Sequence, residues 1–173
     1  MYQSLLLNIT KSIDNKMMGK THLAFGLLFA IVSFIFLPIA GYEISNTFLF
    51  FAVVLFCSLL SDIDEPESKL GRKFPPSILI KLTLGHRGFF HTIWVGLILS
   101  ILFYYFGLIY SIAALIGYCS HLIGDSLTIS GVNWLYPFKG NIKGFIRTGG
   151  FLEKIIFIII CSLNAWLMWK LFI

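Results

Sequence analysis

Histidine and aspartate residues recur at four places along this 173-residue chain, each at the edge of a long apolar run. The densest place is residues 85–92, where His86, Arg87 and His91 lie at the start of a long apolar run. Charged and imidazole side chains are costly near a lipid hydrocarbon core, so they indicate a functional site when they occur there. The other candidates are His22, Asp62, Asp64, His121 and Asp125.

The composition predicts an integral membrane protein. The chain is 58% hydrophobic and only 12% charged, with a mean hydropathy of +0.89. Its apolar runs approach the roughly 20 residues that a membrane-spanning helix needs. The net charge of +5 could indicate nucleic acid binding, but the basic residues lie mostly between the apolar runs, where they set membrane topology. We therefore expect membrane lipids as partners and no nucleic acid.

Five apolar runs predict an all-α fold, a polytopic membrane helical bundle with about five transmembrane helices. They cover residues 22–40, 47–61, 88–106, 110–127 and 151–173. Pro66 disfavours helical backbone at the residue before it, so the second helix should end near residues 62–64. Residues 1–18 are predicted to be an N-terminal extension, and residues 19–173 a single transmembrane domain.

The distribution of Lys and Arg predicts the topology. The N-terminal lead and the loops after the second and fourth runs are basic, whereas the turns after the first and third runs contain neither residue. The positive-inside rule then places the N-terminus in the cytoplasm and the C-terminus outside. Lys170 is the exception, and its long side chain can reach the outer interface. With this topology every candidate His and Asp lies at a cytoplasmic helix end.

The spacing of these residues favours a metal site. His121 and Asp125 are four residues apart, so they share one helix face and could bind one ion together. His86 and His91 are about 140° apart on an ideal helix and converge only if His86 precedes the helix. Imidazole and carboxylate ligands without thiolate suit zinc or manganese, and also iron. Seven candidate ligands suit two ions about 3.5–4 Å apart, an arrangement typical of enzymes that hydrolyse phosphate esters.

Two of the residues are candidates for a catalytic role. The planar guanidinium of Arg87 would fit a phosphate or carboxylate group, and Asp64 would act as a general base if it does not bind metal. Simpler explanations exist for the same residues. Arg87 would also serve as a cytoplasmic anchor, Asp62 and Asp64 as a solvated helix end, and His121 with Asp125 as an interhelical pair worth about 1 kcal/mol.

The order of the motifs resembles that of a known family. The motifs are Thr21-His22 with Gly26, Ser61-Asp62-Ile63-Asp64, His86-Arg87-Gly88-Phe89-Phe90-His91-Thr92, the run GYCSHLIGDSLT at 117–128, Gly131 with Leu135-Tyr136-Pro137-Phe138, and Thr148-Gly149-Gly150 with Glu153. In this order they resemble the LexA-regulated, membrane-bound metal-dependent hydrolase family over roughly residues 18–153.

The resemblance implies a multi-pass inner-membrane protein in which residues 19–173 form one metal-dependent hydrolase-like domain. It also implies metal-ligand positions at His22, Asp62, Asp64, His86, His91, His121 and Asp125. The sequence departs from the family pattern in two places. About 16 residues precede the usual start of the family, and Glu65 stands where the family often has a histidine.

The leading functional hypothesis is a metal-dependent hydrolase that acts on a phosphoester or lipid-like substrate, such as an anionic lipid, at the cytoplasmic membrane interface. The alternative is a non-enzymatic metal-binding or transport protein. Transport would require a polar path to the other side, and the outer halves of the predicted helices carry almost no charge. A third hypothesis is a structural protein in which the polar cluster only holds the helices together.

Overall fold

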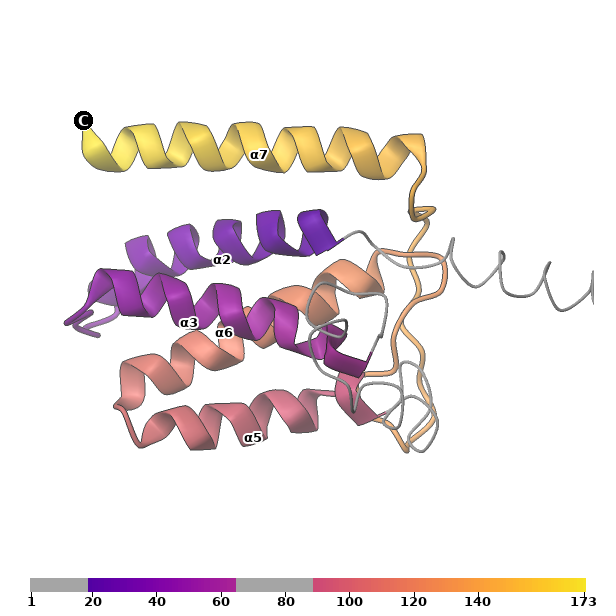
Figure 1. Ribbon diagram of the computed structural model, residues 1–173, viewed down its shortest axis with the longest axis horizontal. Helices are drawn as coiled ribbons and strands as arrows, with labels where there is room; N and C mark the ends of the chain where they lie inside the picture. Colours follow the sequence, from indigo (N-terminus) through magenta and orange to yellow (C-terminus); the bar gives the residue numbers. More distant parts are fainter. Residues whose placement is uncertain (1–18, 65–88) are drawn as a thin grey trace, which may run out of the picture.

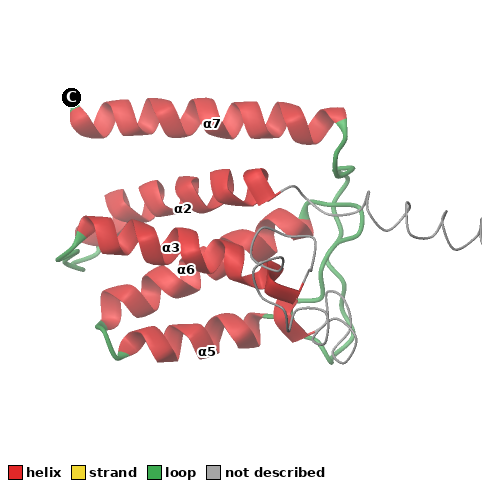
Figure 2. Ribbon diagram, in the orientation of Figure 1, coloured by secondary structure: helices red, strands yellow, loops and turns green. Residues whose placement is uncertain are grey.

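The computed structural model describes residues 19–64 and 89–173, without the side chains of residues 63, 64 and 172. These ranges contain five α-helices and no β-strand (Figure 2), which confirms the predicted all-α fold. The α-helices are α2 (Gly19–Ile39), α3 (Thr47–Leu60), α5 (Ile93–Tyr104), α6 (Leu108–Ser126) and α7 (Phe151–Phe172). Two short 3₁₀ helices, η1 (Ser61–Asp64) and η3 (Phe89–His91), follow α3 and precede α5.

Three of these helices are long and apolar enough to cross a membrane. They are α2, α6 and α7, whose apolar spans contain 21, 19 and 21 residues. With 14 and 12 residues, α3 and α5 are about 21 and 18 Å long, less than the roughly 30 Å of a bilayer core. A 3₁₀ helix with a candidate ligand adjoins each of them: η1, with Asp62, follows α3, and η3, with His91, precedes α5.

The start of the third helix differs from the prediction. The apolar run suggested a helix from residue 88, but α5 begins at Ile93. Residues 89–91 form η3, and Thr92 then takes an extended conformation (φ −122°, ψ 156°) with its hydroxyl donating to the Phe89 carbonyl at 2.8 Å. His91 therefore lies in a tight turn before the helix, and its position is not set by helical spacing from α5.

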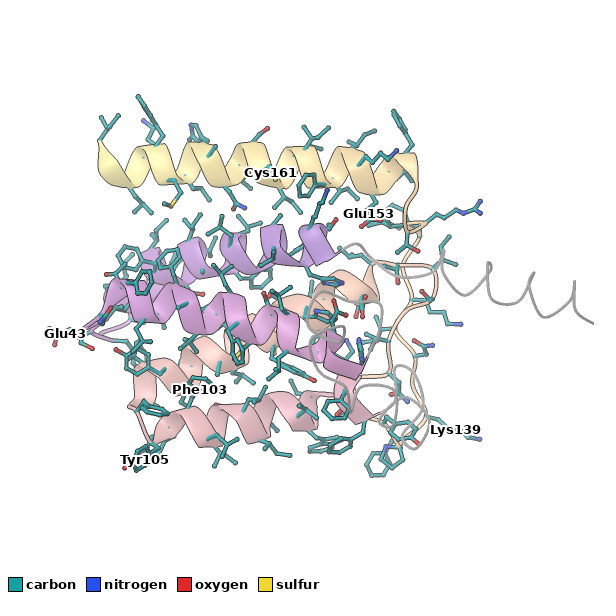
Figure 3. The ribbon with its side chains drawn as sticks, in the orientation of Figure 1. Glu43, Phe103, Tyr105, Lys139, Glu153 and Cys161 are labelled. Atoms are coloured by element: carbon teal, nitrogen blue, oxygen red, sulfur yellow. The ribbon has the colours of Figure 1, made fainter. Side chains whose placement is uncertain are left out.

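The helices lie side by side with their ends at two common levels (Figure 1). Glu43 and Tyr105 mark one end of the bundle, and Lys139 and Glu153 mark the other (Figure 3). The connections α2–α3 and α5–α6 thus lie at one end, and the described loop between α6 and α7 lies at the other. The central helix is α6, which packs against α2, α3 and α5, whereas α7 packs mainly against α2.

A glycine allows the closest approach between α3 and α6. A Cβ atom on Gly117 would overlap the backbone carbonyl of Val54. Small residues permit such contacts between membrane helices, where van der Waals packing provides much of the association energy. Beside this contact lies an apolar core that includes Ala30, Phe50 and Ala114, all fully buried.

Candidate metal centre

Five of the predicted ligands meet at the end of the bundle that Glu153 marks. His22 lies in the first turn of α2, Asp62 in η1, His91 in η3, and His121 and Asp125 in the last two turns of α6. Asp62 is 5% exposed and the other four are fully buried. Five of the seven predicted ligands therefore lie in a single buried cluster.

The remaining predicted site residues are Asp64, His86 and Arg87. His86 and Arg87 lie outside the described residues, and for Asp64 only the backbone, in η1, is described. Their predicted roles as ligand, anion-binding residue and general base stay predictions.

The centre is built around Asp125. Its Oδ1 lies 3.4 Å from His22 Nε2, and its Oδ2 lies 3.4 Å from His91 Nε2 and 3.5 Å from His121 Nε2. Asp62 Oδ1 approaches the same His121 Nε2 at 3.7 Å. These distances exceed the roughly 2.7–3.2 Å of an N–H···O hydrogen bond. Two ligands bonded at about 2.1 Å to one tetrahedral ion would lie about 3.4 Å apart, which matches the observed spacing.

The backbone of α3 fixes the tautomer of His121. Its Nδ1 lies 2.8 Å from the carbonyl oxygen of Ser58, and a carbonyl can only accept, so Nδ1 must carry the proton. In the neutral ring Nε2 then presents a lone pair toward Asp62 and Asp125. Lone pairs of nitrogen and of carboxylate oxygen repel unless a cation lies between them. This is the usual arrangement of a metal-binding histidine, whose second nitrogen donates to a backbone or carboxylate oxygen.

The imidazole rings also pack in a way that suits their neutral form. The rings of His22 and His121 stack with centroids 3.8 Å apart and planes 12° apart, and His91 meets His121 edge-on at 5.4 Å. Two imidazolium ions stacked at this distance would repel strongly in a buried site. Neutral imidazole is the form that binds metals.

The donor groups fall into two overlapping sets. One set is His22, His121 and Asp125, the other is Asp62, His91 and His121, and within each set the ligand atoms lie within 4.8 Å of one another. His121 belongs to both sets, but Nε2 of its neutral ring has one lone pair, which can bind only one ion. The described residues therefore offer a nearly complete ligand set for one ion. Oδ1 of Asp125 and Nε2 of His22 would provide two of the ligands for a second ion.

Neighbouring residues hold the ligands in place. Tyr118, one turn before His121 on α6, donates its hydroxyl to the carbonyl of Phe90, which fixes η3 next to His91. The backbone amide of Ile93 donates to Trp134 O at 2.9 Å, so the loop after α6 also holds this turn. The i−3 spacing of Tyr118 from His121 is a sequence feature that could have placed Tyr118 near the site. No sequence feature indicated its contact with Phe90.

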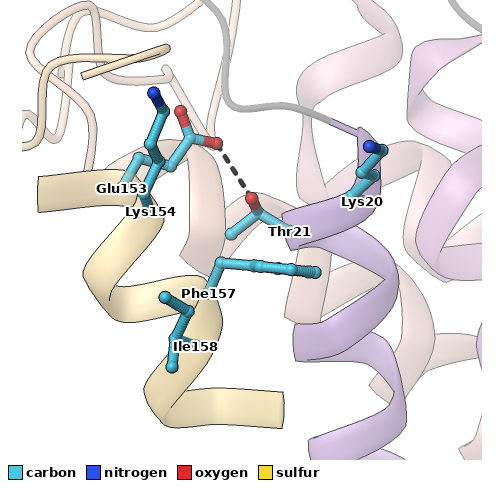
Figure 4. A pocket seen from close by; sticks show the side chains of 6 residues that line it. All are labelled: Lys20, Thr21, Glu153, Lys154, Phe157 and Ile158. Carbon is cyan, nitrogen blue, oxygen red and sulfur yellow. Dashed lines mark hydrogen bonds between the residues drawn. The ribbon is translucent and has the colours of Figure 1, made fainter. Parts of the chain in front are cut away.

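A second contact fixes the start of α2. Thr21, adjacent to His22, donates its hydroxyl to Glu153 Oε1 at 2.9 Å (Figure 4). The amide of Gly149 donates to Glu153 Oε2 at 2.6 Å. Glu153 is only 1% exposed. Its carboxylate thus ties α7 and the preceding turn to the helix that carries His22, which gives the motif around residues 148–153 a structural role.

Ser58 contributes to the site through its backbone. Its side chain turns away from the ligands, because its hydroxyl donates to Leu55 O at 2.8 Å within α3. The backbone carbonyl of Ser58 is the group that meets His121. A carbonyl is available at every residue, so the residue type could not reveal this role.

Replacing Tyr118 with phenylalanine should weaken metal binding about tenfold, because outer hydrogen-bond partners of metal ligands typically contribute 10- to 100-fold in affinity. The substitution removes only the hydroxyl that holds η3. Metal affinity, measured by competition with a chromogenic chelator, checks this. Tyr104→Phe, at an exposed position near the opposite end of the bundle, should leave the affinity unchanged. Equal affinities in the two variants would contradict the positioning role.

Fold and site together define a helical membrane protein with a buried His/Asp cluster that could hold a metal ion. The chain belongs to the YdjM inner membrane protein family, whose model matches residues 17–172. It is 31% identical over 145 residues to the uncharacterized protein YvsG of Bacillus subtilis, an alignment that covers 81% of this chain and 87% of that protein.

Two further relatives carry the family name. The chain is 34% identical over 129 residues to the inner membrane protein YdjM of Escherichia coli and, equally, to that of Shigella flexneri. The alignment covers 68% of this chain but 64% of each relative, so the chain spans slightly less than two thirds of their length. No solved structure matches the chain. The family and the apolar helices support a location in the inner membrane, while the orientation of the termini stays a prediction.

Proposed function

We propose that this protein is a membrane-bound, metal-dependent hydrolase that cleaves a phosphoester in a lipid or lipid-like substrate. The observation that carries the proposal is the arrangement of three buried imidazole Nε2 atoms around the carboxylate of Asp125 at 3.4–3.5 Å. A buried carboxylate is costly unless it is compensated. A divalent cation among these atoms would compensate it and satisfy the lone pair that His121 directs inward.

The proposed ligands are the five clustered residues, with Asp64 and His86 completing the set for one or two zinc or manganese ions. A bound divalent ion would act as a Lewis acid. It would lower the pKa of a coordinated water, so that hydroxide would be available to attack an ester at neutral pH. Arg87 is proposed to hold the anionic group of the substrate, and Asp64 to accept a proton if it is not a ligand.

The surroundings of the cluster favour an anionic substrate at the cytoplasmic interface. Lys139, Lys143 and Arg147 are exposed in the loop between α6 and α7, at the same end of the bundle as the cluster. Glu43 marks the opposite end. By the positive-inside rule we propose that the basic end is cytoplasmic, with the N-terminus inside and the C-terminus outside. The cluster would then lie near the lipid head groups.

The packing beyond the cluster disfavours the alternative of metal transport. Along α3 and α6, the buried residues that lead from the site toward the opposite end are mostly apolar, and they include Val54, Cys57, Ala113 and Ala114. A transported ion would need polar groups along this path. In the part of the chain that the structure describes, this segment of the core contains no acidic or histidine side chain.

A hydrolysis assay tests the proposal. The detergent-purified protein, loaded with zinc or manganese, should cleave an anionic phospholipid in mixed micelles, and His121→Ala should lower the rate at least about 100-fold. Arg87→Ala should retain the metal but lose most of the activity. Lys170→Ala, at the far end of α7, is the control. Metal flux into proteoliposomes without ester cleavage would contradict the proposal and support the transport alternative.

A further inference from the structure

A groove lies between α2 and α7, apart from the metal centre. We propose that it binds one anionic phospholipid of the surrounding membrane. In this proposal the lipid phosphate lies between Lys20 and Lys154, and one acyl chain follows the groove along the two helices. The proposal does not depend on the hydrolase activity.

The groove consists of two adjoining hollows of about 350 and 400 Å³ that share Lys20 and Phe157 as lining residues. Each is within the size range of small-molecule sites, roughly 300–1,000 Å³. The first lies at the end of the helix pair where Thr21 meets Glu153 (Figure 4). The second continues toward the middle of the bundle, where Leu27, Cys161 and Met168 line it. Its length and apolar lining suit a hydrocarbon chain.

The charge at the mouth of the groove suits a phosphate. Lys20 on α2 and Lys154 on α7 are both exposed and stand on either side of the Thr21–Glu153 hydrogen bond (Figure 4). Neither lysine forms an ion pair with any described residue. The one carboxylate here, Glu153, is 1% exposed and already accepts two hydrogen bonds, from Thr21 and from Gly149. Two exposed cations above an apolar groove match a lipid with a negatively charged head group.

Polar contacts join the two helices at the mouth of the groove and part of the way along it. Thr21 and Glu153 join them at the mouth, and Asn164 of α7 donates to the Ala24 carbonyl of α2 at 3.0 Å further along. Hydrogen bonds of this kind join membrane helices without the close packing of small residues. The groove is thus a fixed feature of the α2–α7 pair.

The groove and the metal centre lie on different sides of α2. Lys20 and His22 are two residues apart, which is about 200° around an ideal helix. His22 is fully buried against the cluster, whereas Lys20 is exposed and lines the groove. A loss of lipid binding should therefore leave metal binding intact, and this separates the present proposal from the proposed function.

Native mass spectrometry of the full chain in detergent tests the site, with dioleoylphosphatidylglycerol and dioleoylphosphatidylcholine as probes. We expect one tightly bound phosphatidylglycerol on the wild type and weaker binding of phosphatidylcholine. The double substitution Lys20→Ala/Lys154→Ala should weaken phosphatidylglycerol binding at least about tenfold, since each lysine attracts an anionic head group. Its metal content should equal that of the wild type.

Two further variants place the lipid within the groove. Ala165→Phe adds bulk to the groove wall at an exposed position and should weaken the binding of both lipids. Lys170→Ala removes an exposed lysine of the same helix that does not line the groove and should change neither. Unchanged phosphatidylglycerol binding in the double variant or in Ala165→Phe would overturn the proposal. Equal binding of the two lipids by the wild type would also overturn it. A wild-type dimer that Ala165→Phe abolishes would do the same, because a second copy of the chain would then cover the groove.

Discussion

Asp125→Asn is expected to lower the metal content of the purified protein from near-stoichiometric to background. Both oxygens of Asp125 face histidine Nε2 atoms, one toward His22 and the other toward His91 and His121. Asparagine keeps the shape but removes the charge and replaces one oxygen with an NH₂ group, which cannot bind a cation. The loss of affinity should exceed about 100-fold, the upper range for outer-sphere partners. Elemental analysis after purification without chelator measures it.

Two comparisons make this result specific. Asp62→Asn should have a smaller effect, because the contact of Asp62 with the cluster is the longer 3.7 Å approach to His121. Glu43→Gln removes a carboxylate at the opposite end of the bundle and should leave the metal content unchanged. A well-folded wild type without metal would contradict the metal centre and favour the structural hypothesis, in which protons alone hold the histidines and carboxylates together.

Metal removal should also lower stability. A ligand that binds only the native state stabilises it by about 2.7 kcal/mol at a free concentration of 100 times Kd. Chelator should therefore lower the unfolding temperature of the wild type in detergent. Asp125→Asn, which has no ion to lose, should unfold at the same temperature with and without chelator. A chelator effect of equal size in both proteins would point to an ion bound elsewhere.

Most of the fold could be predicted because membrane helices must satisfy their backbone internally and present apolar side chains to lipid. The predicted run 151–173 became α7, which ends at Phe172, and the run 47–61 became α3, which ends at Leu60. The error at α5 has a local cause. Phe89 and Phe90 are apolar and extend the run, but they form a 3₁₀ turn, and hydropathy does not distinguish this turn from an α-helix.

The candidate site was predictable where one helix or one membrane level determined it. His121 and Asp125 lie on one face of α6 because of their i, i+4 spacing, and the topology brought His22, Asp62 and His91 to the same level. The contacts between helices depend on rotation and packing that no spacing within a single helix reveals. The hydrogen bonds from His121 to the Ser58 carbonyl and from Tyr118 to Phe90 belong to this second kind.

Gly117→Ala is expected to destabilise the protein and to disrupt the metal centre together. A Cβ atom at this position would overlap the backbone carbonyl of Val54, and a backbone group cannot rotate away as a side chain can. Helix α6 would have to move away from α3, and overpacking of this kind typically costs about 1–3 kcal/mol. Thermal unfolding in detergent should show a clear decrease in the midpoint.

The loss of metal follows from the register of the two helices. Gly117 meets Val54, and one turn further along the same interface His121 meets the carbonyl of Ser58. A shift of α6 that relieves the overlap with Val54 would lengthen the hydrogen bond from His121 to the Ser58 carbonyl. The imidazole of His121 would then no longer be held with Nε2 toward the other ligands. Gly19→Ala is the matched control, because nothing lies within 4 Å of a Cβ atom there, and alanine favours a helix by about 1 kcal/mol over glycine. If Gly117→Ala kept both the midpoint and the metal, α3 and α6 would have to be further apart than described, and the tautomer of His121 would need another cause.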